Sequence, residues 1–71
     1  MGKLYKVWAD SESLVEMPAD EAGLFESLDK ACDLACDLAH AHDGMPYRAI
    51  FHVEDVDIDE TIETFENTMF G

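Results

Sequence analysis

The feature that most limits the fold of this 71-residue sequence is its excess of negative charge. Seventeen Asp and Glu residues are balanced by only four Lys and Arg residues, which leaves a formal net charge of −13 at pH 7. Such a chain repels itself when it becomes compact, so the fold must bury enough apolar surface to offset the repulsion. Leu, Ile, Val and Phe supply 17 of the 71 residues, which is above the roughly 20% below which highly charged chains stay unfolded. The sequence therefore predicts a folded protein with a small core.

The charge also excludes two classes of direct partner. A nucleic-acid-binding protein needs a basic surface, and the few cations of this chain are scattered along it: Lys3, Lys6, Lys30 and Arg48. A helix that lies on a membrane needs Lys and Arg on its polar face, and a membrane span needs about 18 apolar residues in succession. We therefore expect neither direct nucleic-acid binding nor membrane binding.

The start of the sequence and its cysteines indicate a cytoplasmic protein. Residues 1–6 lack the apolar stretch of a secretory signal. Cys32 and Cys36 lie four residues apart, where they would be neighbours on one helix face and poorly placed for a disulfide. We expect reduced thiols that serve as small apolar helix residues.

Three segments predict β-strands in a single domain that spans residues 1–71. Residues 3–9 are rich in aromatic and β-favouring side chains, and residues 13–17 would complete a hairpin that ends at Pro18. The third strand, 46–53, alternates in polarity, so one set of its side chains should face a helix. That set is Tyr47, Ala49, Phe51 and Val53.

One amphipathic helix is predicted over residues 28–42. Ser27 suits its N-cap, and Gly44 suits the position just past its end. Apolar side chains recur between them at helical spacing. They are Leu28, Ala31, Cys32, Ala35, Leu38, Ala39 and His42.

The C-terminal segment allows two interpretations. Ile58, Ile62, Phe65 and Met69 fall at i, i+4, i+7 and i+11, a spacing that predicts a second helix capped by Asp57 or Asp59. The threonines of the segment weaken helix propensity, so a strand remains the alternative. We expect an α+β protein with the order β-β-α-β-α, in which a three-stranded antiparallel sheet packs against one main helix.

The same segment partly matches an EF-hand calcium loop. The residues at loop positions 1, 3, 5, 8 and 12 are Asp55, Asp57, Asp59, Ile62 and Glu66. Position 6 needs glycine for its sharp turn, but Glu60 stands there. A degenerate EF-hand-like calcium site is therefore only an alternative.

No other pattern in the sequence predicts a metal site or a catalytic site. Cys32, Cys36 and His40 follow one another at intervals of four residues. Four residues turn a helix by one full turn plus about 40°, so the three side chains point in progressively different directions and cannot all reach one metal ion. A thiol among carboxylates is also a poor nucleophile, because negative surroundings oppose the thiolate. We expect a protein that is not an enzyme and has no cofactor and no metal ligands.

The acidic residues themselves are patterned. Asp29, Asp33 and Asp37 follow one another at i, i+4 and i+8 on the predicted helix, with an axial rise of about 6 Å between them. This spacing is comparable to that of neighbouring phosphates along a nucleic-acid strand, so the row can occupy a basic groove. A second acidic set lies in the tail: Glu60, Glu63 and Glu66. These six residues are the predicted partner-binding residues.

Two functional hypotheses compete for this acidity. One is a protein-binding inhibitor that imitates nucleic acid on a basic protein surface. The other is a halophile-type acidic domain, in which Asp and Glu replace Lys over the whole surface and no partner is implied.

In size, α+β pattern and charge, the whole chain resembles the small acidic inhibitors encoded by bacteriophages and mobile elements, particularly the anti-CRISPR proteins. The resemblance implies binding to a bacterial defence complex, where it would block nucleic-acid recognition or nuclease recruitment. It transfers no functional positions, because no motif of that group maps onto particular residues here. The target complex is therefore left open.

Several apolar residues have no evident partner in a core this small. They are Leu14, Leu24, Phe25 and Phe70. We expect some of this surface to be buried between two copies in a homodimer.

Overall fold

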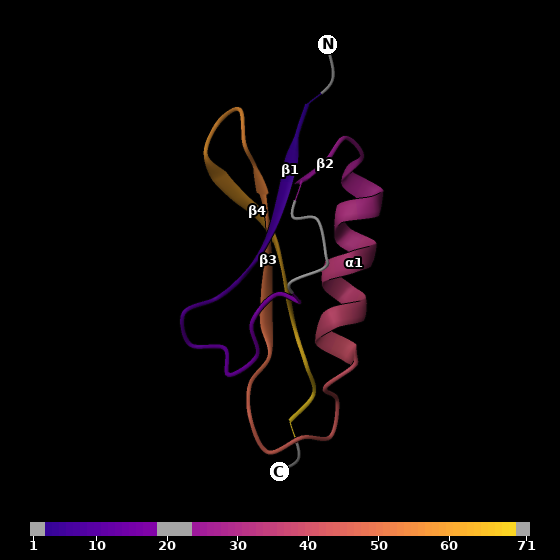
Figure 1. Cartoon of the computed structure of the whole chain (residues 1–71), viewed down its shortest axis with the longest axis vertical. Helices are drawn as coiled ribbons and strands as arrows, with labels where there is room; N and C mark the ends of the chain where they lie inside the picture. Colours follow the sequence, from indigo (N-terminus) through magenta and orange to yellow (C-terminus); the bar gives the residue numbers. More distant parts are fainter. Residues whose placement is uncertain (1–2, 19–23, 70–71) are drawn as a thin grey trace.

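The computed structural model describes residues 3–18 and 24–69 as one sheet covered on one face by one helix (Figure 1). The elements in chain order are β1 (Tyr5–Ala9), β2 (Leu24–Phe25), α1 (Leu28–His40), β3 (Ile50–Asp55) and β4 (Glu60–Glu66). The strand order is β2-β1-β3-β4, and every neighbouring pair is antiparallel. The α+β class is thus confirmed, with four strands in place of the three predicted. No helix of this part of the chain is both long and apolar enough to span a membrane.

The core lies between α1 and the two central strands. Ala31, Ala35 and Ala39 are fully buried on the helix face that meets the sheet. Because their side chains are small, the helix can lie close to the sheet, where it covers Phe51 and Val53. These two are the largest fully buried side chains of the described residues, so the core is narrow.

The predicted helix is confirmed with a shorter C-terminal end. The Ser27 hydroxyl accepts a hydrogen bond from the amide of Lys30 at 3.4 Å, as an N-cap should. The helix ends at His40, two residues before the predicted end. Gly44 lies beyond a further turn, with a φ of 82° that favours glycine.

The side chains of the predicted third strand face the core as expected, but the strand begins later in the sequence than predicted. β3 runs from Ile50 to Asp55, whereas the prediction placed the strand at 46–53. Ala49, Phe51 and Val53 are buried in the core as expected. Tyr47 lies before the strand, in the loop that follows α1.

The predicted hairpin between residues 3–9 and 13–17 is wrong. Segment 13–17 is not a strand, and β1 pairs with β3 along its length, with Val7 opposite Val53. The Ser13 hydroxyl accepts a hydrogen bond from the amide of Ile50 at 3.2 Å. Short polar side chains that bind backbone amides compete with a regular ladder, so this segment crosses the end of β3 as an irregular loop.

The predicted C-terminal helix is also wrong, and the alternative of a strand is correct. Val53 pairs with Glu63 and Glu54 pairs with Thr61, which leaves Ile62 as an extra residue in a β-bulge of β4. A regular strand would send Ile62 and Phe65, three residues apart, to opposite faces. The bulge lets both pack against the core, and their helix-like spacing therefore arises within a strand.

The exposed apolar residues only partly match the sequence expectation. Leu14 and Leu24 are 75% and 55% exposed. Phe25, however, packs against the core from β2. Phe70 lies outside the described residues.

Candidate protein-binding surface

The three predicted aspartates of α1 form a row on its outer side. Asp29, Asp33 and Asp37 are all exposed, and each lies two residues before a buried alanine. Two residues turn a helix by about 200°, so the carboxylates face away from the sheet. Within residues 3–18 and 24–69, none of the three forms an ion pair.

The structure places the three predicted tail glutamates in different surroundings. Glu66 accepts hydrogen bonds from Nε and Nη2 of Arg48 at 3.1 and 3.2 Å, which neutralises its charge locally. Glu60 stands at the far end of β4, beside the hairpin turn. Glu63 pairs with Val53, a residue that faces the helix, so Glu63 lies on the α1 side of the sheet near the middle of β4.

Glu63 of β4 and two aspartates of the helix row act on the same thiol, that of Cys32. Burial raises the pKa of the Cys32 thiol above its ordinary value, and the negative charges of Glu63, Asp29 and Asp33 raise it further, in that order. Carboxylates of both α1 and β4 thus raise the pKa of this one thiol. We refer to Asp29, Asp33, Asp37 and Glu63 as the acidic surface.

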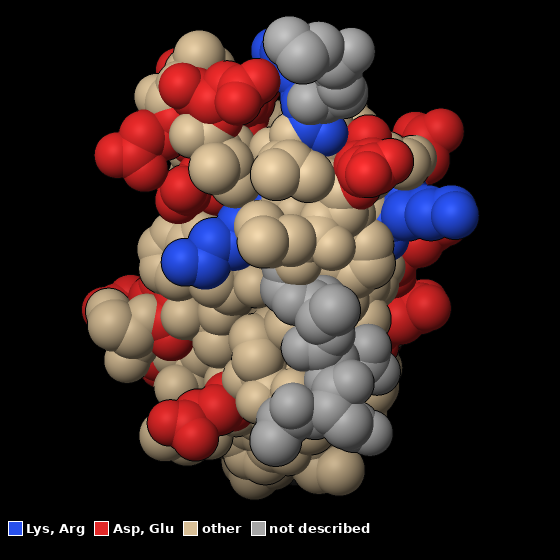
Figure 2. All heavy atoms as spheres, turned by 45° about the horizontal axis from the view of Figure 1, so that its top comes forward, with Lys and Arg blue, Asp and Glu red and all other residues tan. Residues whose placement is uncertain are grey.

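Two of the four cations of the chain form ion pairs away from the acidic surface, and a third, Lys30, lies on α1 next to Asp29. Lys3 pairs with Asp55 at 3.1 Å, and Arg48 lies between Glu66 and Glu12. In Figure 2, Asp and Glu side chains gather on both flanks of the molecule, and few Lys or Arg side chains interrupt them. Among the described residues, no member of the acidic surface forms an ion pair, and Lys30 is the one cation that α1 itself carries in Leu28–His40.

The residues of the calcium-loop pattern do not converge on one point. Asp55 is buried, where its carboxylate binds Lys3 and accepts a hydrogen bond from the amide of Asp57 at 3.0 Å. Glu66 lies at the opposite end of the hairpin, because it pairs with Ile50 while Asp55 pairs with Glu60. The part of the chain that is described contains no group of three or more His, Cys, Asp or Glu side chains placed to hold a metal ion.

The Cys32–Cys36–His40 set is not brought together either. Cys32 and Cys36 are free, half-buried thiols, and the His40 ring bonds to Asp43 at 2.8 Å. A protonated, half-buried Cys32 is a poor nucleophile and a poor metal ligand.

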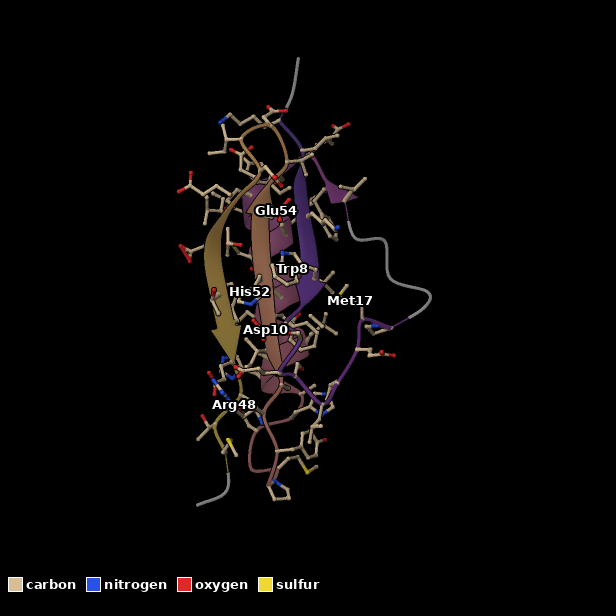
Figure 3. All side chains as sticks on the ribbon, turned by 90° about the vertical axis from the view of Figure 1, so that its left-hand side faces the viewer. Trp8, Asp10, Met17, Arg48, His52 and Glu54 are labelled. Carbon is tan, nitrogen blue, oxygen red and sulfur yellow. The ribbon has the colours of Figure 1, made fainter. Side chains whose placement is uncertain are left out.

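A cluster of side chains around His52, on the face of the sheet that α1 does not cover, was not predicted from the sequence. His52 Nε2 lies 2.5 Å from Asp10 Oδ2, and His52 Nδ1 lies 2.8 Å from Thr64 Oγ1. The Trp8 ring packs against the imidazole at 4.4 Å between ring centroids (Figure 3). The order carboxylate, imidazole, hydroxyl is that of a nucleophilic triad, but the described residues enclose no pocket for a substrate. The cluster instead ties the loop after β1 to β3 and β4.

Four carboxylates of the described chain have pKa values below their ordinary range. The principal cause is a hydrogen bond in each case: from His52 to Asp10, from the Thr68 amide to Asp43, from Lys3 to Asp55 and from Arg48 to Glu66. A carboxylate with a lowered pKa in the folded state stabilises the fold above its unfolded pKa of about 4. That contribution is lost as the pH falls through the folded-state pKa.

We therefore expect the protein to melt at a lower temperature at pH 3 than at pH 6. The comparison requires about 0.5 M NaCl, which screens the long-range repulsion that acidification would otherwise relieve. Circular dichroism melts measure the difference, and Asp55→Asn is the control, because it lacks one of the four groups and should show a smaller decrease. An equal or higher melting temperature at pH 3 would show that the four bonds do not contribute.

The chain matches no protein-family model, and it matches neither a curated protein nor a solved structure.

Proposed function

We propose that this protein is a small acidic inhibitor that binds a basic, nucleic-acid-binding surface of a bacterial defence complex such as a CRISPR effector. The observation that carries the proposal is the row of Asp29, Asp33 and Asp37, exposed on α1 and without ion pairs among the described residues. A groove that binds phosphates offers Lys and Arg to any ligand with charges at a similar spacing. The carboxylates of Asp29, Asp33 and Asp37 are negative charges at such a spacing.

The packing of α1 supports this proposal over binding by a flexible acidic tail. The helix is capped by Ser27, and its alanine face is buried against the sheet. Its carboxylates are therefore held on a rigid support before binding, which reduces the entropy that association costs. In this proposal the protein is encoded by a phage or mobile element, acts in the cytoplasm by occupying its target, and catalyses no reaction.

A phage plating assay tests the proposed function. Bacteria with an active CRISPR system are challenged with a phage that the system targets, with and without expression of this protein, across a panel of CRISPR types. Expression should restore plaque formation in at least one type, while a non-targeted phage plates equally in all strains. Unchanged immunity across the whole panel would contradict the proposal.

The halophile alternative is supported by acidic side chains away from α1, such as Glu12, whose side chain is 71% exposed. A halophile-type surface repels itself at low ionic strength, so the fold would require molar salt. An inhibitor from an ordinary bacterium must be folded near 0.15 M salt, and we expect this protein to give a folded circular dichroism spectrum there. A chain that gains structure only in molar KCl would favour the halophile alternative.

A further inference from the structure

The outer edge of β4 is open in the described structure. β4 is the last strand in the order β2-β1-β3-β4, and within the described residues it pairs with β3 alone. Figure 3 shows it along one side of the sheet, with no further strand beyond it. An open edge strand of seven residues is a template for a further strand.

The pattern of hydrogen bonds between β3 and β4 determines which backbone groups of β4 face outward. The amide of Asn67 donates to the carbonyl of Ala49 at 3.1 Å. In an antiparallel pair, residues alternate between bonding the neighbour and facing away. Phe65 therefore bonds toward β3, and Thr64 and Glu66 direct their N–H and C=O groups outward.

The charges along β4 select the kind of strand that can be added. If a second copy paired its own β4 antiparallel about Glu63, then Glu63 would oppose Glu63 and Glu60 would oppose Glu66. Like charges directly opposite each other destabilise a sheet. In any other register the two copies would still each carry a formal net charge of −13, and this repulsion opposes self-association. A strand with Lys or Arg opposite Glu63 gains a favourable pair instead.

We infer that the edge of β4 binds an extended, Lys- or Arg-rich segment of the target as a fifth strand. Its backbone bonds to Thr64 and Glu66, and its basic side chains lie on the α1 side of the sheet, against Glu63. This is β-strand addition, in which backbone bonds supply affinity and alternate side chains supply specificity. The inference rests on the proposed function and specifies how the target is held.

The geometry identifies which residues of the added strand make each contact. Residues opposite Thr64 and Glu66 share their face of the sheet and bond to them through the backbone. Residues opposite Glu63 and Phe65 point to the α1 side, and their own amides face away from β4. Basic residues and backbone-bonding residues therefore alternate in the target segment.

A synthetic peptide of seven residues, alternating Lys and Thr and matching β4 in length, is the probe. One analogue is N-methylated at its Thr residues, and the matched control is N-methylated at its Lys residues, with the same charge. Isotope-labelled protein should show slower amide exchange at Thr64 and Glu66 with the parent peptide and with the control. The Thr-methylated analogue should bind about tenfold more weakly, because its bonds to β4 are blocked.

Two variants of the protein test the same edge from the other side. Thr64→Pro removes the outward amide without removing a bond to β3, since proline is tolerated on edge strands where the amide faces solvent. Thr64→Val keeps that amide but, like Thr64→Pro, lacks the hydroxyl that bonds to His52. It therefore controls for the loss of that hydrogen bond. Peptide binding should be lost in Thr64→Pro and retained in Thr64→Val, with both variants folded by circular dichroism.

Equal binding of the two methylated peptides, or the absence of protection at Thr64 and Glu66, would overturn the inference. Peptide binding with amide changes confined to α1 would also overturn it, while remaining consistent with the proposed function. Failure of the proposed function appears elsewhere, as unchanged immunity in the plating assay.

Discussion

Replacement of Asn67 by alanine is expected to remove most of the stability of the fold at 25 °C. Asn67 is only 5% exposed and connects the loop after α1 to the end of β4. Its Oδ1 accepts a hydrogen bond from the Ala49 amide at 2.8 Å, and its Nδ2 donates to the carbonyls of His42 and Tyr47 at 2.7 and 3.0 Å. Alanine would leave all three backbone groups without these partners.

The expected size of this effect follows from the small core. A buried polar group left without its partner costs about 1–3 kcal/mol. A core in a chain this short supplies only about 3–5 kcal/mol, so the loss of three such bonds, at about 3 kcal/mol or more in total, removes most of the stability. Urea denaturation followed by circular dichroism measures the difference in the free energy of unfolding.

Two further variants isolate the role of the Asn67 amide. Asn67→Asp keeps an acceptor for Ala49 but loses both donated bonds, so it should also destabilise the fold. Thr68→Ala changes the exposed next residue and should alter the free energy of unfolding by no more than about 0.5 kcal/mol. A loss below about 1 kcal/mol in Asn67→Ala would show that water or rearrangement replaces the three bonds.

The second large effect is expected on inhibition. Changing Asp29, Asp33 and Asp37 together to Asn should leave the protein folded, because the side chains are exposed and similar in size. Helix stability should rise slightly, since like charges four residues apart repel each other. Plaque formation in the plating assay should nevertheless decrease at least about tenfold, because charge pairs contribute both to the association rate and to retention of a bound partner.

The matched comparison is the change of Glu60, Glu63 and Glu66 together to Gln, which alters the net charge by the same amount. Of these three, only Glu63 belongs to the acidic surface, and Glu66 is already paired with Arg48. We expect a smaller loss of inhibition than in the aspartate variant. If both triple variants are folded and inhibit as well as the parent, the acidic surface is not the binding site.

The sequence predicted the features that depend on local periodicity. The alanine spacing of α1 and the alternation of residues 49–53 are properties of single elements, so the helix and the core face of β3 were predicted correctly. The aspartate row follows from the same helical period. It could be located before any tertiary contact was known.

The features that were missed depend on pairing between distant segments. The bulge at Ile62 gives β4 an apolar spacing that resembles a helix. The proximity of Glu63 to the aspartates requires the packing of β4 beside α1, and the contact of His52 with Asp10 requires the register of β3 beside the loop that follows β1. Neither register can be read from a single segment.

Competition with nucleic acid tests the central claim most directly. A purified effector, of the type that the plating assay identifies, is titrated with labelled target DNA at increasing concentrations of this protein, and the apparent Kd of the DNA is measured by fluorescence anisotropy. The acidic surface predicts that the apparent Kd rises with protein concentration, less so at high salt, and much less with the Asp29, Asp33 and Asp37 variant. An unchanged DNA affinity at saturating protein, or equal competition by the parent and the variant, would contradict it.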